Sequence, residues 1–313
     1  MGQDNSNDLP SEGSEEVLTE EMLWERIPQV QGVERANTYY ELSARVYARG
    51  QYEEALALAE SAKDLYIESA ENSEGLAQAY SAMGYNLNQL KRIDEAATAM
   101  GKAVEILRAS KSALALELSN TLGEWLFSSK EYKKTISCMD DCLQEYLVEG
   151  DTVGSANSLY LIGLSHLELK EYESSLDAIR KASEFYKEEK NVVDLGRCYH
   201  KIARINNETQ KYSEALTAAQ KALDIFLTAR DQNRQIFARW ELSKAQMQLE
   251  KPLDAFANLE LILDILIDED PKDFSFIVEV EDRMAQILRI VEREPEALEI
   301  EARLATIKEI LKD

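Results

Sequence analysis

The sequence repeats itself with a period of about 40 residues. Segments such as Glu171-Tyr172-Glu173-Ser174-Ser175 recur, and the small residue near the end of each copy falls at 55, 96, 135, 175, 215, 255 and 297. The intervals between these positions are 41, 39, 40, 40, 40 and 42 residues. A second small residue stands twelve positions earlier in every copy, as Ser43, Gly84, Gly123, Gly163, Ala203, Ser243 and Ala285. Small residues at fixed points of two segments allow two helices to pack closely, so each copy is predicted to be a helix pair.

The hydrophobic spacing within each copy favours helix, and no segment shows the alternation of a strand. First helices are predicted near 35–49, 76–90, 114–129, 154–169, 194–209, 235–249 and 275–291. Second helices are predicted near 52–70, 93–109, 132–149, 172–189, 212–230, 252–269 and 295–312. Pro252 and Pro295 suit the first turn of a helix, where a backbone N–H is not needed. The fold class is therefore predicted to be all-α.

Seven helix pairs in phase over residues 35–312 resemble the tetratricopeptide repeat (TPR) family. The period exceeds the usual TPR length of about 34 residues and looks like the variants with longer helices. The resemblance implies an α-solenoid, a right-handed superhelix of seven TPR-like repeats. It also implies a concave groove lined by the first helices.

Three regions are predicted along the chain. Residues 1–18 are polar and acidic and are interpreted as a disordered tail. Residues 19–34 are expected to hold a short capping helix with Thr19 as its N-cap, followed by a linker. This helix either covers the open end of the first repeat or docks a partner. Residues 35–313 form the predicted repeat domain.

The charge balance excludes several classes of partner. With 35 lysines and arginines against 59 aspartates and glutamates, the formal net charge is −24. Such a chain is unsuited to nucleic acid, whose binding depends on basic surface, and to anionic membranes. No run of about 18 apolar residues predicts a membrane-spanning helix. Three cysteines and an acidic, polar N-terminus without a signal peptide suggest a cytoplasmic protein.

Nothing in the sequence marks catalysis, a cofactor or a metal. His166 and His200 are the two histidines, and neither lies in a known catalytic motif. Cys138 and Cys142 are one helical turn apart, but Cys142 takes a position that alanine holds in other copies, so it is interpreted as a core residue rather than a zinc ligand. We therefore expect no enzyme activity, no cofactor and no metal.

The groove positions that the resemblance implies are rich in aromatic and amide side chains. Such side chains offer contact area and hydrogen bonds to an extended peptide. The residues predicted to contact a partner are Tyr40, Tyr85, Asn120, Asn157, Tyr160, Arg197, His200, Lys201, Arg204, Trp240 and Lys244.

Five of these residues make a basic group in an acidic chain. Arg197, His200, Lys201 and Arg204 share one helical face at i, i+3, i+4 and i+7, and Lys244 follows in the next copy. Two interpretations stay open: the group attracts an acidic group of a partner, or it neutralises the acidic helices around it. The lysine and asparagine pattern of TPR proteins that bind chaperone tails is missing from the first copy, which has Tyr40 and Ala44 at those places.

The sequence as a whole favours a non-enzymatic adaptor or scaffold that binds a protein or peptide in the groove. One alternative is a regulator that senses a short peptide, as bacterial quorum-sensing TPR proteins do. A second alternative is a structural assembly subunit. For that alternative, the apolar segment 252–269 offers a surface for a homodimer, unless the last repeat buries it.

Overall fold

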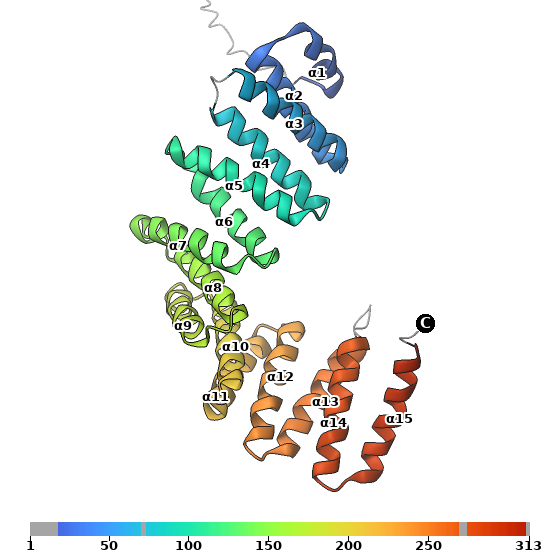
Figure 1. The fold of residues 1–313 in the computed structure, drawn as a ribbon. Coiled ribbons are helices and arrows are strands. Elements are labelled where there is room, and N and C mark those ends of the chain that lie inside the picture. The colour runs from blue at the N-terminus through green and yellow to red at the C-terminus, as the bar shows by residue number, and fades with distance from the viewer. Residues whose placement is uncertain (1–17, 70–72, 269–273, 311–313) are drawn as a thin grey trace, which may run out of the picture. The chain divides into compact units, whose positions relative to one another are not determined.

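A computed structural model describes residues 18–69, 73–268 and 274–310, and within these ranges the regular structure is helical throughout (Figure 1). The helices are α1 (Glu20–Arg26), α2 (Gly32–Ala48), α3 (Tyr52–Ser69), α4 (Ser73–Gln89), α5 (Ile93–Ala109), α6 (Leu114–Ser128), α7 (Tyr132–Glu149), α8 (Thr152–Glu168), α9 (Tyr172–Glu188), α10 (Val192–Glu208), α11 (Tyr212–Thr228), α12 (Gln232–Gln248), α13 (Pro252–Asp268), α14 (Phe274–Ile290) and α15 (Glu294–Ile310), with a 3-10 turn at Ile27–Gln29. The all-α solenoid prediction is confirmed. The number of repeats and the handedness of the superhelix stay predictions.

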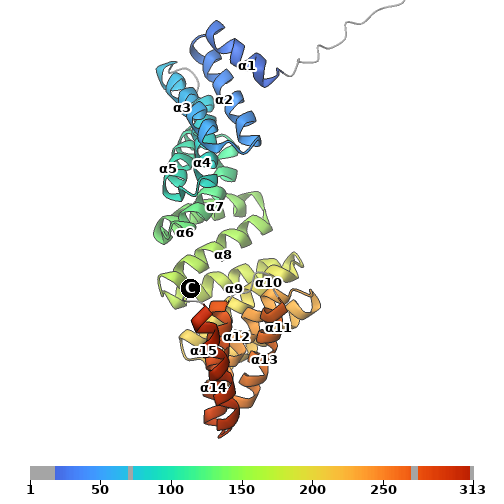
Figure 2. The same ribbon diagram turned by 90° about the vertical axis from the view of Figure 1, so that its right-hand side faces the viewer.

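The chain divides into two compact units, Met1–Leu118 and Ser119–Asp313. In the first unit α2 packs on α3, α3 on α4, and α4 on α5. In the second unit contacts between consecutive helices run from α7 through to α15, and α10 also contacts α12 (Figure 2). Each of these helices therefore packs chiefly on its neighbours in sequence, as expected of a repeat protein.

A left-handed residue ends the first helix of most pairs and turns the chain back. This residue stands five positions before the small residue of the second helix. Its φ is positive at Gly50, Lys91, Lys130, Lys170, Gln210, Glu250 and Glu292. At Lys170, with φ of 60°, the N–H donates to the carbonyl of Leu167, and the N–H of Glu171 donates to that of His166, both at 2.9 Å. These bonds satisfy carbonyls at the helix end that would otherwise lack partners.

The small residues lie at the seam between paired helices, as the repeat predicts. A Cβ added to Gly163 would stand 2.6 Å from Cδ1 and 2.7 Å from Cγ1 of Ile179 on α9. The hydroxyl of Ser175, the small residue of α9, donates to the carbonyl of Gly163 at 2.7 Å. In the first copy the direction is reversed, because Ser43 donates to the carbonyl of Ala55 at 2.7 Å. The two backbones approach closely enough for a hydroxyl to bridge them.

First helices mostly begin two or three residues earlier than predicted, because side chains cap them. Asp151 accepts from the N–H of Gly154 at 2.8 Å, and Asp231 accepts from that of Arg234 at 2.9 Å. Asn191 accepts from the N–H of Asp194 in the same way at 3.4 Å. These three capping residues recur every 40 positions and fix the start of α8, α10 and α12.

The N-terminal helix α1 packs on the first helix pair. Thr19 caps it as predicted, accepting from the N–H of Met22 at 3.2 Å. Leu23 is fully buried against Leu42, Val46, Ala55 and Leu58, and Leu18 packs on the same cluster. Residues 1–17, the rest of the predicted acidic tail, lie outside the described residues.

Helix α13, which carries the predicted dimer segment, packs on both α12 and α14. Leu259, Ile262 and Leu266 are buried in a cluster that α14 and α15 complete. Leu261 keeps 44% of its surface exposed, and Leu253 and Ile267 are also exposed. In the part of the chain that the structure describes, none of the helices is both long and apolar enough to cross a membrane.

Candidate functional site

A pocket of about 420 Å³ in the second unit brings together four of the residues predicted to bind a partner. Asn120, Asn157, Tyr160 and Arg197 all line it, contributed by α6, α8 and α10. The remaining lining residues are Glu124, Met139, Tyr146, Gly154, Leu161, Leu164 and Tyr186. A mixture of aromatic, amide and charged groups in one hollow is suited to binding a polar segment of another molecule.

Tyrosines of the second helices hold the amides of this pocket in place. The hydroxyl of Tyr186 on α9 donates to Oδ1 of Asn157 at 2.6 Å. Asn120 hydrogen-bonds the hydroxyl of Tyr146 on α7. Neither tyrosine is among the predicted contact residues. A signal for Tyr186 exists in the sequence, because Asn37 and Tyr66 in the first unit repeat the 29-residue spacing of Asn157 and Tyr186 and bond at 2.5 Å. The amides are thus positioned rather than free to rotate.

Arg197 is fixed between two groups. Its guanidinium carbon lies 4.6 Å from the ring centroid of Tyr160, and its Nη1 lies 2.7 Å from Oδ1 of Asp194. Asp194 is itself held by a 2.8 Å bond from Nδ2 of Asn191. Burial raises the pKa of Tyr160 to about 12, against the opposing effect of Arg197. Tyr160 is therefore neutral at physiological pH and serves as a platform for the cation.

Two further cations of the predicted basic group also have carboxylate partners. Nη2 of Arg204 lies 3.6 Å from Oε1 of Glu168 on α8. Nζ of Lys244 lies 3.2 Å from Glu241, which is 3% exposed and also accepts a 2.7 Å bond from Asn207. Lys244 is thus the counter-ion of a buried carboxylate. For these cations the structure agrees with the neutralising interpretation.

Lys201 differs from the other cations of the group. Among the described residues, no carboxylate oxygen forms an ion pair with its Nζ, whereas Arg197, Arg204 and Lys244 each have one. Burial and the charges of Arg204 and Arg197 lower the pKa of Lys201, against the opposing effect of Glu168 and Glu241. Glu168 and Glu241 are thus near Lys201 but pair with Arg204 and Lys244, so Lys201 has no carboxylate partner of its own among the described residues.

His200 contributes a ring rather than a charge. Burial, together with the positive charges of Lys201, Arg204 and Lys244, lowers the pKa of His200 to about 3. The imidazole is therefore neutral at physiological pH. It stacks on the ring of Phe237 from α12, with centroids 5.8 Å apart and planes at 28°. His200 extends the surface from the cations of α10 to the aromatic residues of α12.

The other predicted contact residues have different neighbours. Trp240 faces α14, where it packs edge-on against Phe276 at 5.2 Å and beneath Arg283 at 4.2 Å. Tyr40 and Tyr85 belong to the first unit, in which Tyr40 lines a separate pocket of about 540 Å³ with Asn37 and Tyr66. Four of the eleven predicted residues thus line the pocket of the second unit, and Tyr40 lines a pocket of the first unit.

The thiols of the described chain are placed as core groups. Cys142 and Cys198 are buried, and Cys138 is partly buried. Burial raises the pKa of Cys198 to about 12, so this thiol is protonated at physiological pH. Within the described ranges, no group of three or more His, Cys, Asp or Glu residues is arranged to hold a metal ion.

Comparisons with known families agree with the helical repeat. A family model for soluble NSF attachment protein matches residues 91–230, and a tetratricopeptide repeat model matches residues 35–70. A search of curated proteins finds no significant match.

Solved structures share the fold at low sequence identity. RapI in its apo form has a TM-score of 0.64 and 16% identity, over 87% of this chain and 76% of that one. The quorum sensor NprR from B. thuringiensis, also in its apo form, has a TM-score of 0.58 and 12% identity, over 92% of each chain. A signal transduction ATPase with a tetratricopeptide repeat sensor from Pyrococcus horikoshii has a TM-score of 0.68 and 16% identity, over 93% of this chain and 45% of that one. Identities this low show the fold alone.

Proposed function

Because the chain is a helical repeat protein of the tetratricopeptide repeat family, we propose that it is a non-enzymatic adaptor that binds a protein or peptide segment along α8, α10 and α12. The amides and rings of the pocket lined by Asn157 and Tyr160 suit the backbone of an extended segment. We further propose that the protein acts in the cytoplasm.

Lys201 is the observation that carries this proposal. It lies on the same face of α10 as Arg197 and Arg204, whose charges are already balanced by Asp194 and Glu168. Burial, together with the charges of Arg204 and Arg197, lowers the pKa of Lys201 and so makes its protonated amine less favourable, and a carboxylate brought by a partner would relieve that cost. The acidic group of the partner is therefore expected at Lys201, with Arg204 beside it.

Affinity capture from the organism of origin, followed by mass spectrometry, tests the adaptor. Wild-type protein, Lys201→Glu and Lys221→Glu are compared as baits, because both substitutions change the net charge equally and Lys221 is exposed on α11, beside Tyr199. We expect wild type and Lys221→Glu to capture the same amount of a partner protein, and Lys201→Glu to capture at least tenfold less of it. Equal retention by all three baits would remove Lys201 from the binding surface.

A peptide-sensing regulator is the second candidate. The fold likeness to a quorum sensor over 92% of this chain is the observation that favours it. A sensor is expected to become more compact when one short peptide is added, whereas an adaptor keeps its dimensions. Small-angle scattering with and without the captured segment separates the two.

A further inference from the structure

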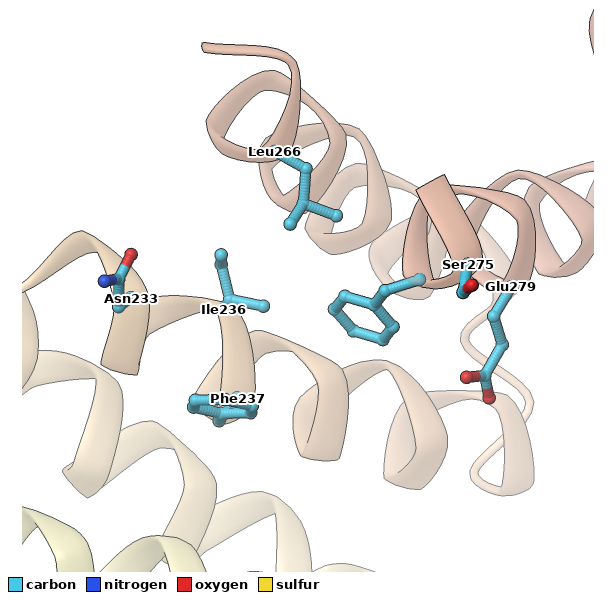
Figure 3. Close-up of a pocket in the computed structure, with 7 residues that line it drawn as sticks. Asn233, Ile236, Phe237, Leu266, Ser275 and Glu279 are labelled. Carbon is cyan, nitrogen blue, oxygen red and sulfur yellow. The ribbon is translucent and has the colours of Figure 1, made fainter. Parts of the chain in front are cut away.

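A second hollow, of about 630 Å³, lies beside the cations in the same unit. The apolar part of its lining comes from Ile236 and Phe237 on α12, Leu266 near the end of α13, and Phe276 on α14, and the polar part is Asn233, Ser275 and Glu279. In Figure 3 the side chains of Ile236 and Leu266 point toward each other across this hollow, with Ser275 and Glu279 at its edge. The hollow has the size of a large side chain together with part of the backbone that carries it.

Phe237 connects this hollow to the cations of α10. Its ring lines the hollow and also stacks on His200, the residue next to Lys201. It keeps 51% of its surface exposed, which is a high fraction for an aromatic side chain on a helix that packs on α10, α11 and α13. An exposed apolar patch that continues into a cationic one is typical of a binding surface with two contact points.

We propose that the hollow receives a bulky apolar side chain of the same segment whose acidic group contacts Lys201. This inference rests on the proposed function and specifies its partner: an extended peptide with an Asp or Glu and a Leu, Ile, Met or Phe. Packed helices stand roughly 8–10 Å apart, and an extended chain rises about 3.3 Å per residue. Since the hollow lies one to two first helices beyond α10, the two partner residues are separated by roughly three to six positions.

Charge and chemistry select this occupant over others. An ion pair with Lys201 fixes the acidic end of the segment, and an apolar side chain that leaves water adds affinity and fixes the register of the peptide. A second copy of this chain also has a net charge of −24, so the two copies would repel each other. A short segment with one acidic group does not meet that repulsion.

Selection from a phage-displayed library of random peptides on the full chain tests the proposal. We expect enriched sequences to share an acidic and a bulky apolar residue at a fixed spacing. Binding of a synthetic selected peptide is then measured by fluorescence polarisation on Lys201→Glu, Ser275→Trp and Ser174→Trp. Ser275 is exposed at the edge of the hollow, so tryptophan there fills it without disturbing the core, and Ser174 is an exposed residue of α9.

The expected result is a tenfold or greater loss of affinity for both Lys201→Glu and Ser275→Trp, and none for Ser174→Trp. Replacing the apolar residue of the peptide by alanine should also lower its affinity for the wild-type protein tenfold or more. The same replacement should lower the affinity for Ser275→Trp less than twofold, since the tryptophan already fills the hollow. Phe237→Ala provides a second variant if Ser275→Trp alters the helical circular dichroism.

Two failures are distinguishable. Selected peptides that depend on Lys201 but carry no apolar residue at fixed spacing, and that tolerate Ser275→Trp, overturn the inference and leave the adaptor in place. Absence of any selected peptide, or peptides that tolerate both variants, overturns the adaptor as well. Binding of a second copy of the chain at the hollow, detected as a dimer that Ser275→Trp dissociates, also contradicts the inference.

Discussion

At the scale of single residues, His200 reports on the electrostatics of the candidate site. The residue lies between three cations and the ring of Phe237, and these surroundings keep the imidazole neutral. In the unfolded chain the same imidazole takes up a proton near its ordinary pKa of about 6.5. The unfolded state therefore binds more protons than the folded state as the pH falls below that value, and stability decreases with acidification.

The first prediction concerns this proton. Between pH 7.5 and 5.5, His200 should cost the wild-type protein up to about 1.4 kcal/mol of unfolding free energy, because one proton is bound only by the unfolded state. His200→Gln removes that contribution, so its free energy of unfolding should fall less over the same interval. Urea unfolding at the two pH values measures the difference. An identical fall in both proteins would mean that His200 is protonated normally in the folded state.

The sequence alone could not show which cations of the site pair with a carboxylate. Arg197, Lys201 and Arg204 have the spacing of one helical face in the sequence, and all three lie on α10. Which of them is paired depends on Glu168 and Asp194, and Glu168 comes from a different helix. Pairing across helices is a property of packing, so the sequence predicted a basic group but could not single out Lys201.

At the scale of helical elements, the turns inside the repeats contain residues under backbone strain. Lys170 has a φ of 60°, a conformation that costs a residue with a Cβ about 1–2 kcal/mol and costs glycine little. Gly50 occupies the same place in the first copy. The repeat thus keeps one backbone conformation while the residue that adopts it varies.

The second prediction uses this conformation. Lys170→Gly should raise the free energy of unfolding by about 0.5–1 kcal/mol, since relief of the strained φ exceeds the entropy that glycine loses on folding. Lys181→Gly is the matched control, because Lys181 lies inside α9 and its exposed ion pair with Asp177 is weak. That control should lower the free energy by about 1 kcal/mol. Changes of the same sign in both variants, measured by urea unfolding, would contradict this account.

Periodicity predicted most of the helical architecture because it reports packing directly. Gly163, which faces Ile179, is an example. Forty residues later the corresponding positions are Ala203 and Ala219, so the smallest residue is paired with a large one in the first case and two small residues are paired in the second. Helix starts are predicted less well, because the capping residues Asp151, Asn191 and Asp231 are polar and lie outside the hydrophobic pattern on which the helix prediction rests. Their 40-residue spacing is visible once the caps are known.

At the scale of the whole molecule, the net charge of −24 governs how copies of the chain meet. The charge is unevenly distributed, because α10 gathers Arg197, Lys201 and Arg204 on one face. A partner segment with an acidic group is attracted to that face, whereas a second whole chain is repelled by the sum of its charges. The repulsion weakens as salt shortens the Debye length from about 10 Å at 0.1 M to about 3 Å at 1 M.

The third prediction concerns the proposed dimer through 252–269. Exposed Leu253, Leu261 and Ile267 on α13 would supply its contacts, but exposed Glu260 and Asp264 lie among them. We therefore expect a monomer at low salt and self-association only at high salt, observed by sedimentation velocity over a range of concentrations. Leu261→Lys should abolish that association. Leu298→Lys, an equal charge change at an exposed leucine of α15, should not. A wild-type chain that stays monomeric at high concentration and high salt would remove α13 as an interface, because screening leaves no repulsion to oppose the apolar contact.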